Sequence, residues 1–121
     1  MADTRQPLDV VKALYEALGR EDFAGARRLL GEPFSFVAWF DRLDDPDAYI
    51  EVVRKLRGFI VKADFHHVLV DGDHVCVIYD ATTVRGDVSI AAAWFHVCDG
   101  RIVSVRIICD PRPMLQLFEK S

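Results

Sequence analysis

The chain has 121 residues, of which 51% are hydrophobic and 28% are charged, with a formal net charge of −4. This length predicts a single domain spanning 1–121, and the apolar content is enough for a buried core, which argues against disorder. Apolar runs such as 75–79 are too short for a membrane span, and basic residues do not cluster, so neither a membrane nor a nucleic acid is an expected partner.

Three cysteines, Cys76, Cys98 and Cys109, lie far apart and form no Cys-x-x-Cys pair. Their odd number and spacing argue against a disulfide framework and against a zinc site. The chain also opens without the basic-then-apolar leader of a secretory signal. We therefore expect small buried thiols in a cytoplasmic protein that uses no metal and no cofactor.

Apolar residues in the first half recur three and four positions apart, which predicts three helices. The first follows Asp9, the expected N-cap, and ends at Gly19, whereas Pro33 stops the second. The third begins at Asp45, with proline next. Residues 34–40 are uncharged and mostly aromatic or β-branched, which predicts a strand between the second and third helices. The three apolar stripes are Val10, Val11, Leu14 and Leu18; Phe23, Ala26, Leu29 and Leu30; and Tyr49, Val52, Val53, Leu56 and Phe59 or Ile60.

After residue 60 the apolar residues alternate, which predicts strands. Glycine-containing turn signals at 71–73, 85–87 and 99–100 separate them, and each is typical of a hairpin. The element order is therefore α-α-β-α-β-β-β-β, an α+β architecture in which the helices cover one face of an antiparallel sheet. The four expected strands are 61–70, 74–84, 88–97 and 102–109.

Three segments carry a resemblance to a known superfamily. They are residues 10–18 leading into 21–23, the hairpin at 71–75 and the stretch 99–106. Together they resemble the NTF2-like superfamily, which includes ketosteroid isomerases, scytalone dehydratase, limonene epoxide hydrolases and SnoaL-type polyketide cyclases. The resemblance covers about residues 8–118. It implies a cone in which three helices pack on a curved sheet and leave a deep apolar pocket for function.

Strand 61–70 has apolar residues at its odd positions, so we expect these, with His67 among them, to face the pocket. A two-residue turn at 71–72 would then pair Ala63 with Asp80 and place a carboxylate in an apolar set. Burial raises the pKa of a carboxyl group, which suits a general acid or base. Asp80 has two interpretations, a pocket acid or base and a strand-end or rim carboxylate that is solvated or paired. His67 is either a proton-transfer group or a core histidine.

The last two strands give conflicting registers. Tight turns would align Asp80 with Arg106 across three strands, similar to epoxide-hydrolase members of the superfamily. The final strand, however, alternates apolar residues with Arg106, and burying the apolar set is the favoured outcome. We therefore predict a β-bulge in strand 88–97 that leaves Arg106 outward and turns Trp94 or His96 inward.

The end of the chain resembles SnoaL-type cyclases, which carry a His and an Asp in this region, so His96 and Asp110 are further candidates. Asp110 before a proline is equally typical of a turn or helix cap. Ketosteroid isomerases need an Asp on the first strand and a Tyr on the first helix. The corresponding positions look like Ala38 and Leu14, with Tyr15 on another helical face, so that isomerase chemistry is not expected.

Two functions fit these predictions. The first is a small cofactor-independent enzyme that binds a compact apolar molecule. In it Asp80, helped by His67 or His96, moves a proton in an isomerisation, dehydration, cyclisation or epoxide opening. The second is a non-catalytic ligand-binding or dimerisation domain of the same fold. The expected pocket lining is Phe36, Ala38, Tyr49, Ile78, Thr82, Trp94 and Ile107.

The opposite face of the predicted sheet is also apolar. We expect Val75, Val77, Tyr79 and Ala81 to face away from the pocket, joined by Ile90, with Trp94 as a further candidate. Such a patch is rare on a monomer. It predicts a homodimer in which two sheets pack back to back.

Overall fold

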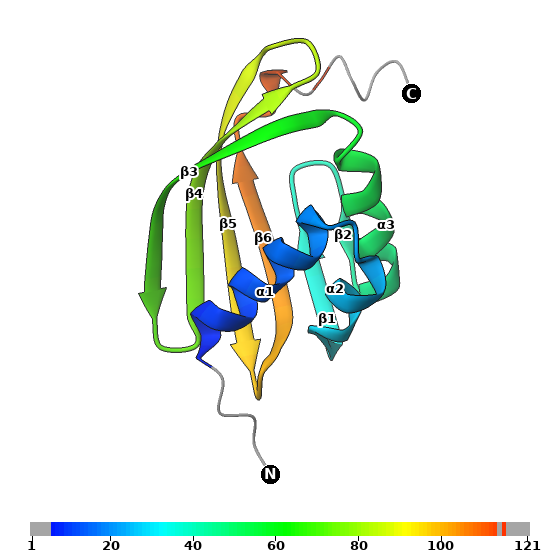
Figure 1. Cartoon of the computed structure of the whole chain (residues 1–121), viewed down its shortest axis with the longest axis vertical. Coiled ribbons are helices and arrows are strands. Elements are labelled where there is room, and N and C mark those ends of the chain that lie inside the picture. Colours follow the sequence, from blue (N-terminus) through cyan, green and yellow to red (C-terminus); the bar gives the residue numbers. More distant parts are fainter. Residues whose placement is uncertain (1–5, 114, 116–121) are drawn as a thin grey trace.

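The structure, a computed structural model, describes residues 6–113 and 115, and places three helices on one face of a six-stranded sheet (Figure 1). The strands lie in the order β2-β1-β6-β5-β4-β3, with β1 parallel to β6 and all other neighbours antiparallel. The predicted α+β class and NTF2-like cone are confirmed. The elements are α1 (Pro7–Gly19), α2 (Phe23–Arg28), β1 (Leu30–Val37), β2 (Arg42–Leu43), α3 (Pro46–Leu56), β3 (Ile60–Asp71), β4 (His74–Thr83), β5 (Val88–Cys98) and β6 (Arg101–Cys109).

The first strand differs most from its predicted bounds. It begins at Leu30, includes Pro33, and ends at Val37, and the two-residue β2 beside it was not predicted. Proline is tolerated here because the register of β1 against β6 shifts between Leu30 and Ser35, where regular ladder hydrogen bonds are interrupted. No helix among the described residues is both long and apolar enough to cross a bilayer.

Each helix begins at a recognisable cap or proline. The N-cap of α1 is Gln6, not Asp9, which lies in the first turn, where a carboxylate still favours the helix dipole. Asp22 caps α2 by accepting a 2.9 Å hydrogen bond from the Gly25 amide. Asp45 caps α3 as predicted, accepting from the backbone N–H two residues ahead at 3.0 Å.

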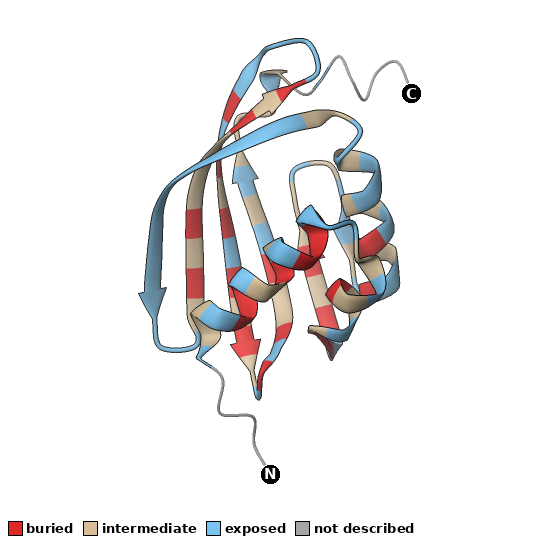
Figure 2. Ribbon diagram, in the orientation of Figure 1, coloured by how far each residue is buried: buried red, intermediate tan, exposed pale blue. Residues whose placement is uncertain are grey.

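The core lies between the three helices and the sheet face that they cover, with buried residues from β1, β4, β5 and β6 (Figure 2). Every second residue of β5 is buried against the helices, and β4 and β6 follow the same alternation with some half-buried members, such as Tyr79 and Ile107. Burial of each large apolar side chain contributes roughly 1.5–3 kcal/mol. The largest of them are Phe36, Phe95, Leu14, Leu30 and Ile102.

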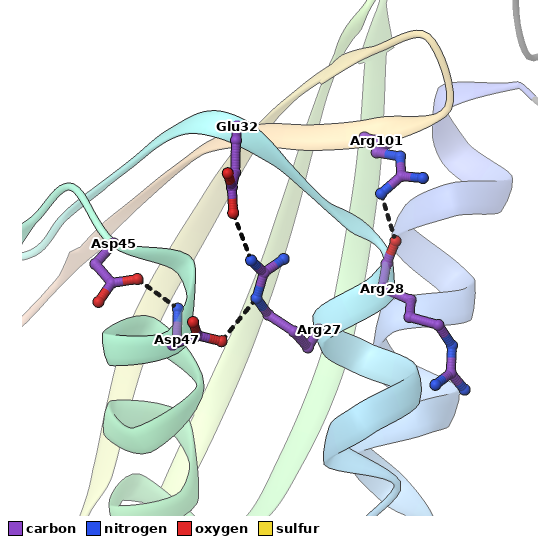
Figure 3. Close-up of polar contacts among 6 residues, drawn as sticks. All are labelled: Arg27, Arg28, Glu32, Asp45, Asp47 and Arg101. Carbon is purple, nitrogen blue, oxygen red and sulfur yellow. Dashed lines mark hydrogen bonds and ion pairs between the residues drawn. The ribbon is translucent and has the colours of Figure 1, made fainter.

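Arg27 of α2 links three elements, α2, β1 and α3 (Figure 3). Its guanidinium donates to Glu32 of β1 at 2.7 Å and to Asp47 of α3 at 2.8 Å. The hydrogen bond to Asp47 is the main reason that the pKa of Arg27 is raised further. Both carboxylates are exposed, so the network orients α2 and α3 more than it stabilises them.

The edge strand β3 determines how the sheet curls. Its register against β4 shifts twice, between Ile60 and Lys62 and between Phe65 and His67. Each extra residue bends the strand and increases its twist. β3 therefore crosses over one end of the sheet before it runs down beside β4 (Figure 1).

Candidate functional site

A cavity of about 550 Å³ lies between the helices and the sheet face that they cover. A cavity of this size accommodates a small organic molecule. Residues of α1, α3 and every long strand line it, and most of them are aliphatic or aromatic. The aromatic members are Tyr15, Phe36, Tyr49, Phe65, Tyr79 and Phe95.

Three tyrosines bring hydroxyl groups to this apolar lining, one each from α1, α3 and β4. Their rings are fixed by contacts with phenylalanines. The Tyr15 and Tyr79 rings lie 5.1 and 5.5 Å from Phe65, and Tyr49 lies 5.1 Å from Phe36. Tilted and edge-on ring pairs at such distances are favourable and directional. The three phenols are therefore held by packing rather than by polar contacts.

None of the three hydroxyl groups of Tyr15, Tyr49 and Tyr79 makes a hydrogen bond within residues 6–113 and 115. In the described residues, every side-chain nitrogen or oxygen atom that solvent cannot reach has a hydrogen-bond partner. Each hydroxyl must therefore reach accessible space, and the space that all three residues share is the cavity. They are free to bond to whatever occupies it.

Burial keeps these phenols protonated. It raises the pKa of Tyr79 to about 12 and raises the pKa values of Tyr15 and Tyr49 further above their usual range. The mutual repulsion of the three phenolates adds to this effect, since ionised Tyr79 would disfavour ionisation of the other two. At neutral pH the cavity therefore offers three neutral donors.

Two cationic residues, Arg57 and Lys62, also contribute to the lining. The Lys62 ammonium lies 3.5 Å from Asp64, which is paired with Asp80 in the ladder and shares its face. Its side chain thus points away from the helices, and Arg57 is the charged side chain that remains beside the cavity. Among the described residues, no Asp, Glu or His lines the cavity.

Asp80, the predicted pocket carboxylate, lies on the sheet face away from the helices, called here the outer face. It pairs with Asp64 and Ile90 in the two adjoining ladders, and its carboxylate lies 2.9 Å from His66 Nε2. Its neighbour Tyr79 faces the cavity instead. The expected orientation of Asp80 was wrong, and the structure agrees with the alternative interpretation of a paired carboxylate.

The cause is the register shift between Phe65 and His67. We predicted one alternation along the whole of strand 61–70, but the extra residue reverses it. Phe65 faces the cavity as expected, whereas His67 pairs with Ile78 on the outer face. The pairing of β4 with β3 residues beyond this shift therefore turns toward the cavity the face of β4 opposite to the one that we predicted.

The candidate histidines do not meet in the cavity. His67 is exposed on the edge strand. His96 lies on the outer face, stacked on His74 at 4.3 Å, and its Nε2 is 3.5 Å from the Cys98 thiol. The Trp94 indole donates to His74 Nδ1 at 2.9 Å, so Trp94 also faces outward. The expectation that Trp94 or His96 turns inward was wrong.

Asp110 lies just beyond β6 and outside the cavity. Its carboxylate accepts from the Arg112 backbone amide at 3.1 Å and from the Arg112 guanidinium at 2.6 Å. These bonds hold the pKa of Asp110 at about 2. The geometry is that of the turn or cap interpretation.

The predicted lining is partly correct. Phe36, Tyr49 and Ile107 line the cavity. Ala38 lies beyond the end of β1, where its amide bonds to the Asp41 carbonyl. Ile78 and Thr82 point outward with Asp80, for the register reason given above. Trp94 points outward because β5 keeps one register against β4 from Val88 to His96, so no bulge turns it inward.

Arg106 faces outward as predicted, although the bulge is not where we expected it. The register of β5 against β6 shifts between His96 and Val97, and the extra residue is Val103 in β6. Arg106 pairs with Trp94, and its guanidinium lies 5.4 Å from that ring.

The two functional residues missed in the sequence are Tyr15 and Tyr79. Tyr15 lies one turn beyond Val11 on α1, so its spacing alone could have placed it beside the core. Tyr79 belongs to the set Val75, Val77 and Ala81, which is more apolar than the alternate set containing Asp80. That contrast is the signal that identifies the buried face of β4.

The cysteines are free thiols, as expected, but Cys76, Cys98 and Cys109 are half-buried rather than enclosed. Burial raises the pKa of the Cys109 thiol. Within the described part of the chain, no three His, Cys, Asp or Glu residues are arranged to bind a metal ion.

Comparison with solved structures shows the same architecture elsewhere. An NTF2-like protein of unknown function from Cytophaga hutchinsonii aligns with a TM-score of 0.79 and 28% identity, over 95% of this chain and 99% of its own. IdmH of Streptomyces antibioticus, a candidate polyketide cyclase, aligns with a TM-score of 0.75 and 21% identity, over 95% and 99%. An M. tuberculosis LEH-like epoxide hydrolase aligns with a TM-score of 0.72 and 23% identity, over 95% and 96%. At these identities, the last two share the fold alone.

Sequence comparison gives the family. No protein of curated function matches the chain significantly. The model of the SnoaL-like domain matches residues 11–105, which is most of the chain. The chain therefore belongs to the SnoaL-like domain family of the NTF2-like superfamily.

Proposed function

We propose that this protein binds a compact, mostly apolar small molecule in the cavity under α1 and α3. The observation that carries the proposal is the set of three neutral phenols, unpartnered among the described residues, in an otherwise apolar lining. A ligand with an acceptor oxygen would satisfy those donors while its apolar body replaces water along the walls.

The test uses two uncharged probes of matched shape, 2-acetylnaphthalene and 2-ethylnaphthalene, which differ in a carbonyl oxygen. We expect both to bind and the ketone to bind about five- to tenfold more tightly, because a buried hydrogen bond contributes about 1 kcal/mol. The preference should shrink in Tyr15→Phe, Tyr49→Phe or Tyr79→Phe. If neither probe binds, the proposal of ligand binding in the cavity is contradicted. Equal affinities in all four proteins would contradict the role of the hydroxyls.

Cofactor-independent catalysis is the second candidate, and the protonation state of the phenols favours it. A phenol that donates to a carbonyl oxygen stabilises the negative charge that forms there when the neighbouring carbon loses a proton. Since no Asp, Glu or His lines the cavity among the described residues, water or a group on the substrate would take that proton. Isomerisation and cyclisation fit this arrangement, and in dehydration or epoxide opening the same phenol would donate to the leaving oxygen.

A deuterium-exchange experiment separates catalysis from binding. In D2O, a catalytic cavity should accelerate exchange of the methyl protons of 2-acetylnaphthalene, and Tyr79→Phe should slow that exchange. Tight binding with no acceleration would favour the non-catalytic alternative.

We also propose that two copies associate through the outer face. Ile90, Trp94 and Ile108 are 67%, 40% and 63% exposed on this face, which the helices do not cover. The composition differs from the prediction, because Val75, Val77, Tyr79 and Ala81 lie on the covered face, whereas Ile90 and Trp94 of the predicted set lie on the outer face. Sedimentation should show a dimer at tens of micromolar and a monomer for Ile90→Asp. A wild-type monomer would contradict the assembly.

A further inference from the structure

Of the two cationic residues that line the cavity within the described part of the chain, Arg57 is the one whose head group is not paired on the outer face. Arg57 caps the C-terminus of α3 and lines the cavity together with Gly19, the last residue of α1. No carboxylate lines the cavity in the described part of the chain, and the neighbouring lining cation, Lys62, directs its ammonium to Asp64 on the other face. Arg57 therefore determines the charge beside the cavity.

The present partner of Arg57 is weak. Its guanidinium lies 3.8 Å from the carboxylate of Glu21, in the turn between α1 and α2, and the Glu21 side chain is 70% exposed. An exposed ion pair of this length contributes little, because water screens it and two long side chains must be held in place. If a ligand carboxylate replaced Glu21 as the partner of Arg57, the free energy of unfolding would change very little.

Two further features favour an anion at this end. Lys55 adds a positive charge in the last turn of α3, whereas Arg54 in the same turn is paired with Glu51 at 3.5 Å. A side chain added at Gly19 would meet no atom within 4 Å, which leaves room beside the cavity at the end of α1. A planar guanidinium beside such a space, held by a 3.8 Å contact to an exposed carboxylate, suits bidentate recognition of a carboxylate.

Building on the proposed function, we infer that the natural ligand is an apolar carboxylic acid whose anionic end is held by Arg57 after Glu21 is displaced. The apolar body lies against the aromatic walls, and an oxygen further along it accepts from the tyrosine hydroxyls. The ligand enters past Gly19, with its charged group last.

A comparison of the binding affinities of 2-naphthoate, which is an anion, and 2-acetylnaphthalene, which is uncharged, tests this inference. The wild-type protein should bind the anion about tenfold more tightly, since a charge-assisted hydrogen bond is stronger than a neutral one. Arg57→Gln should remove that preference without changing the affinity for the ketone, and Arg57→Lys should keep part of it. Glu21→Gln should strengthen naphthoate binding about two- to threefold by releasing Arg57. Lys55→Gln removes a nearby cation that does not line the cavity, and it serves as the matched control.

Gly19→Leu provides a steric test that does not depend on charge. It should weaken both probes together, because the new side chain would occupy the opening. The inference is overturned if the wild-type protein binds both probes equally, or if Arg57→Gln weakens both to the same extent, and in those cases ligand binding in the cavity still stands. If neither probe binds, the proposed function fails as well.

Discussion

The two faces of the sheet carry different chemistry, although adjacent residues of the same strands supply them. The covered face has phenols and apolar side chains around a cavity, whereas the outer face has the His66–Asp80 pair and the stacked His74 and His96 rings. The carboxylate and imidazole groups usually sought as acids and bases are therefore on the face without the cavity. Which chemistry is available to a ligand depends on strand register rather than on which residues the strand contains.

The largest expected contrast between the faces is in stability. Phe95 is 2% exposed on the covered face, and Ile90 on the same strand is 67% exposed on the outer face. Phe95→Ala should lower the free energy of unfolding by about 3–5 kcal/mol. Ile90→Ala should change it by about 0.5 kcal/mol or less. Urea denaturation at low protein concentration measures both, and similar losses for the two variants would contradict the assignment of the faces.

Alkaline pH sharpens the same comparison through Tyr79. The pKa of this phenol is about 12 in the folded protein, against 10.0 for the unperturbed group. Between those values the unfolded chain loses its proton first, so folding stability is fully present below pH 10 and falls as the pH approaches 12. The expected slope is roughly 1.4 kcal/mol per pH unit for this residue. Tyr79→Phe should show a shallower decline than the wild type, and identical slopes would show that Tyr79 is not buried.

A smaller effect is expected on ligand binding, where Tyr79 on the covered face is compared with its neighbour Asp80 on the outer face. Tyr79→Phe should weaken binding of 2-acetylnaphthalene by about fivefold, because one donor to its carbonyl oxygen is lost. Isothermal titration of the wild type and the variant provides the measurement. An unchanged affinity would remove Tyr79 from the set of binding groups.

The smallest effect should come from Asp80→Asn. Its carboxylate faces His66 across the outer face and does not line the cavity, so the affinity for 2-acetylnaphthalene should match that of the wild type. Titration under the same conditions checks this expectation. A marked loss of affinity with retained folding would restore Asp80 as a cavity residue.

Helices, hairpins and their order could be predicted because each has a local cause in the sequence. The stripe of α1 and the turn at Gly72 are examples, since helical spacing and a residue that tolerates positive φ are visible in the chain. The extra residue near His66 has no such local mark. It depends on how the edge strand bends over the helices, which is a property of the folded sheet.

That single residue determined the outcome for the candidate site. It reversed which residues of β4 face the cavity, so that Tyr79 lines the cavity in place of Asp80. The composition of the two alternate sets in β4 was the better guide, because burying valine and alanine is favoured over burying an unpaired carboxylate.

Nuclear Overhauser effects between bound 2-acetylnaphthalene and labelled aromatic side chains test the central assignment most directly. With tyrosine and histidine rings labelled, the structure predicts contacts from the ligand to the rings of Tyr15, Tyr49 and Tyr79, and none to His66 or His96. Contacts to the histidine rings, with none to the tyrosines, would contradict it and move the binding site to the outer face.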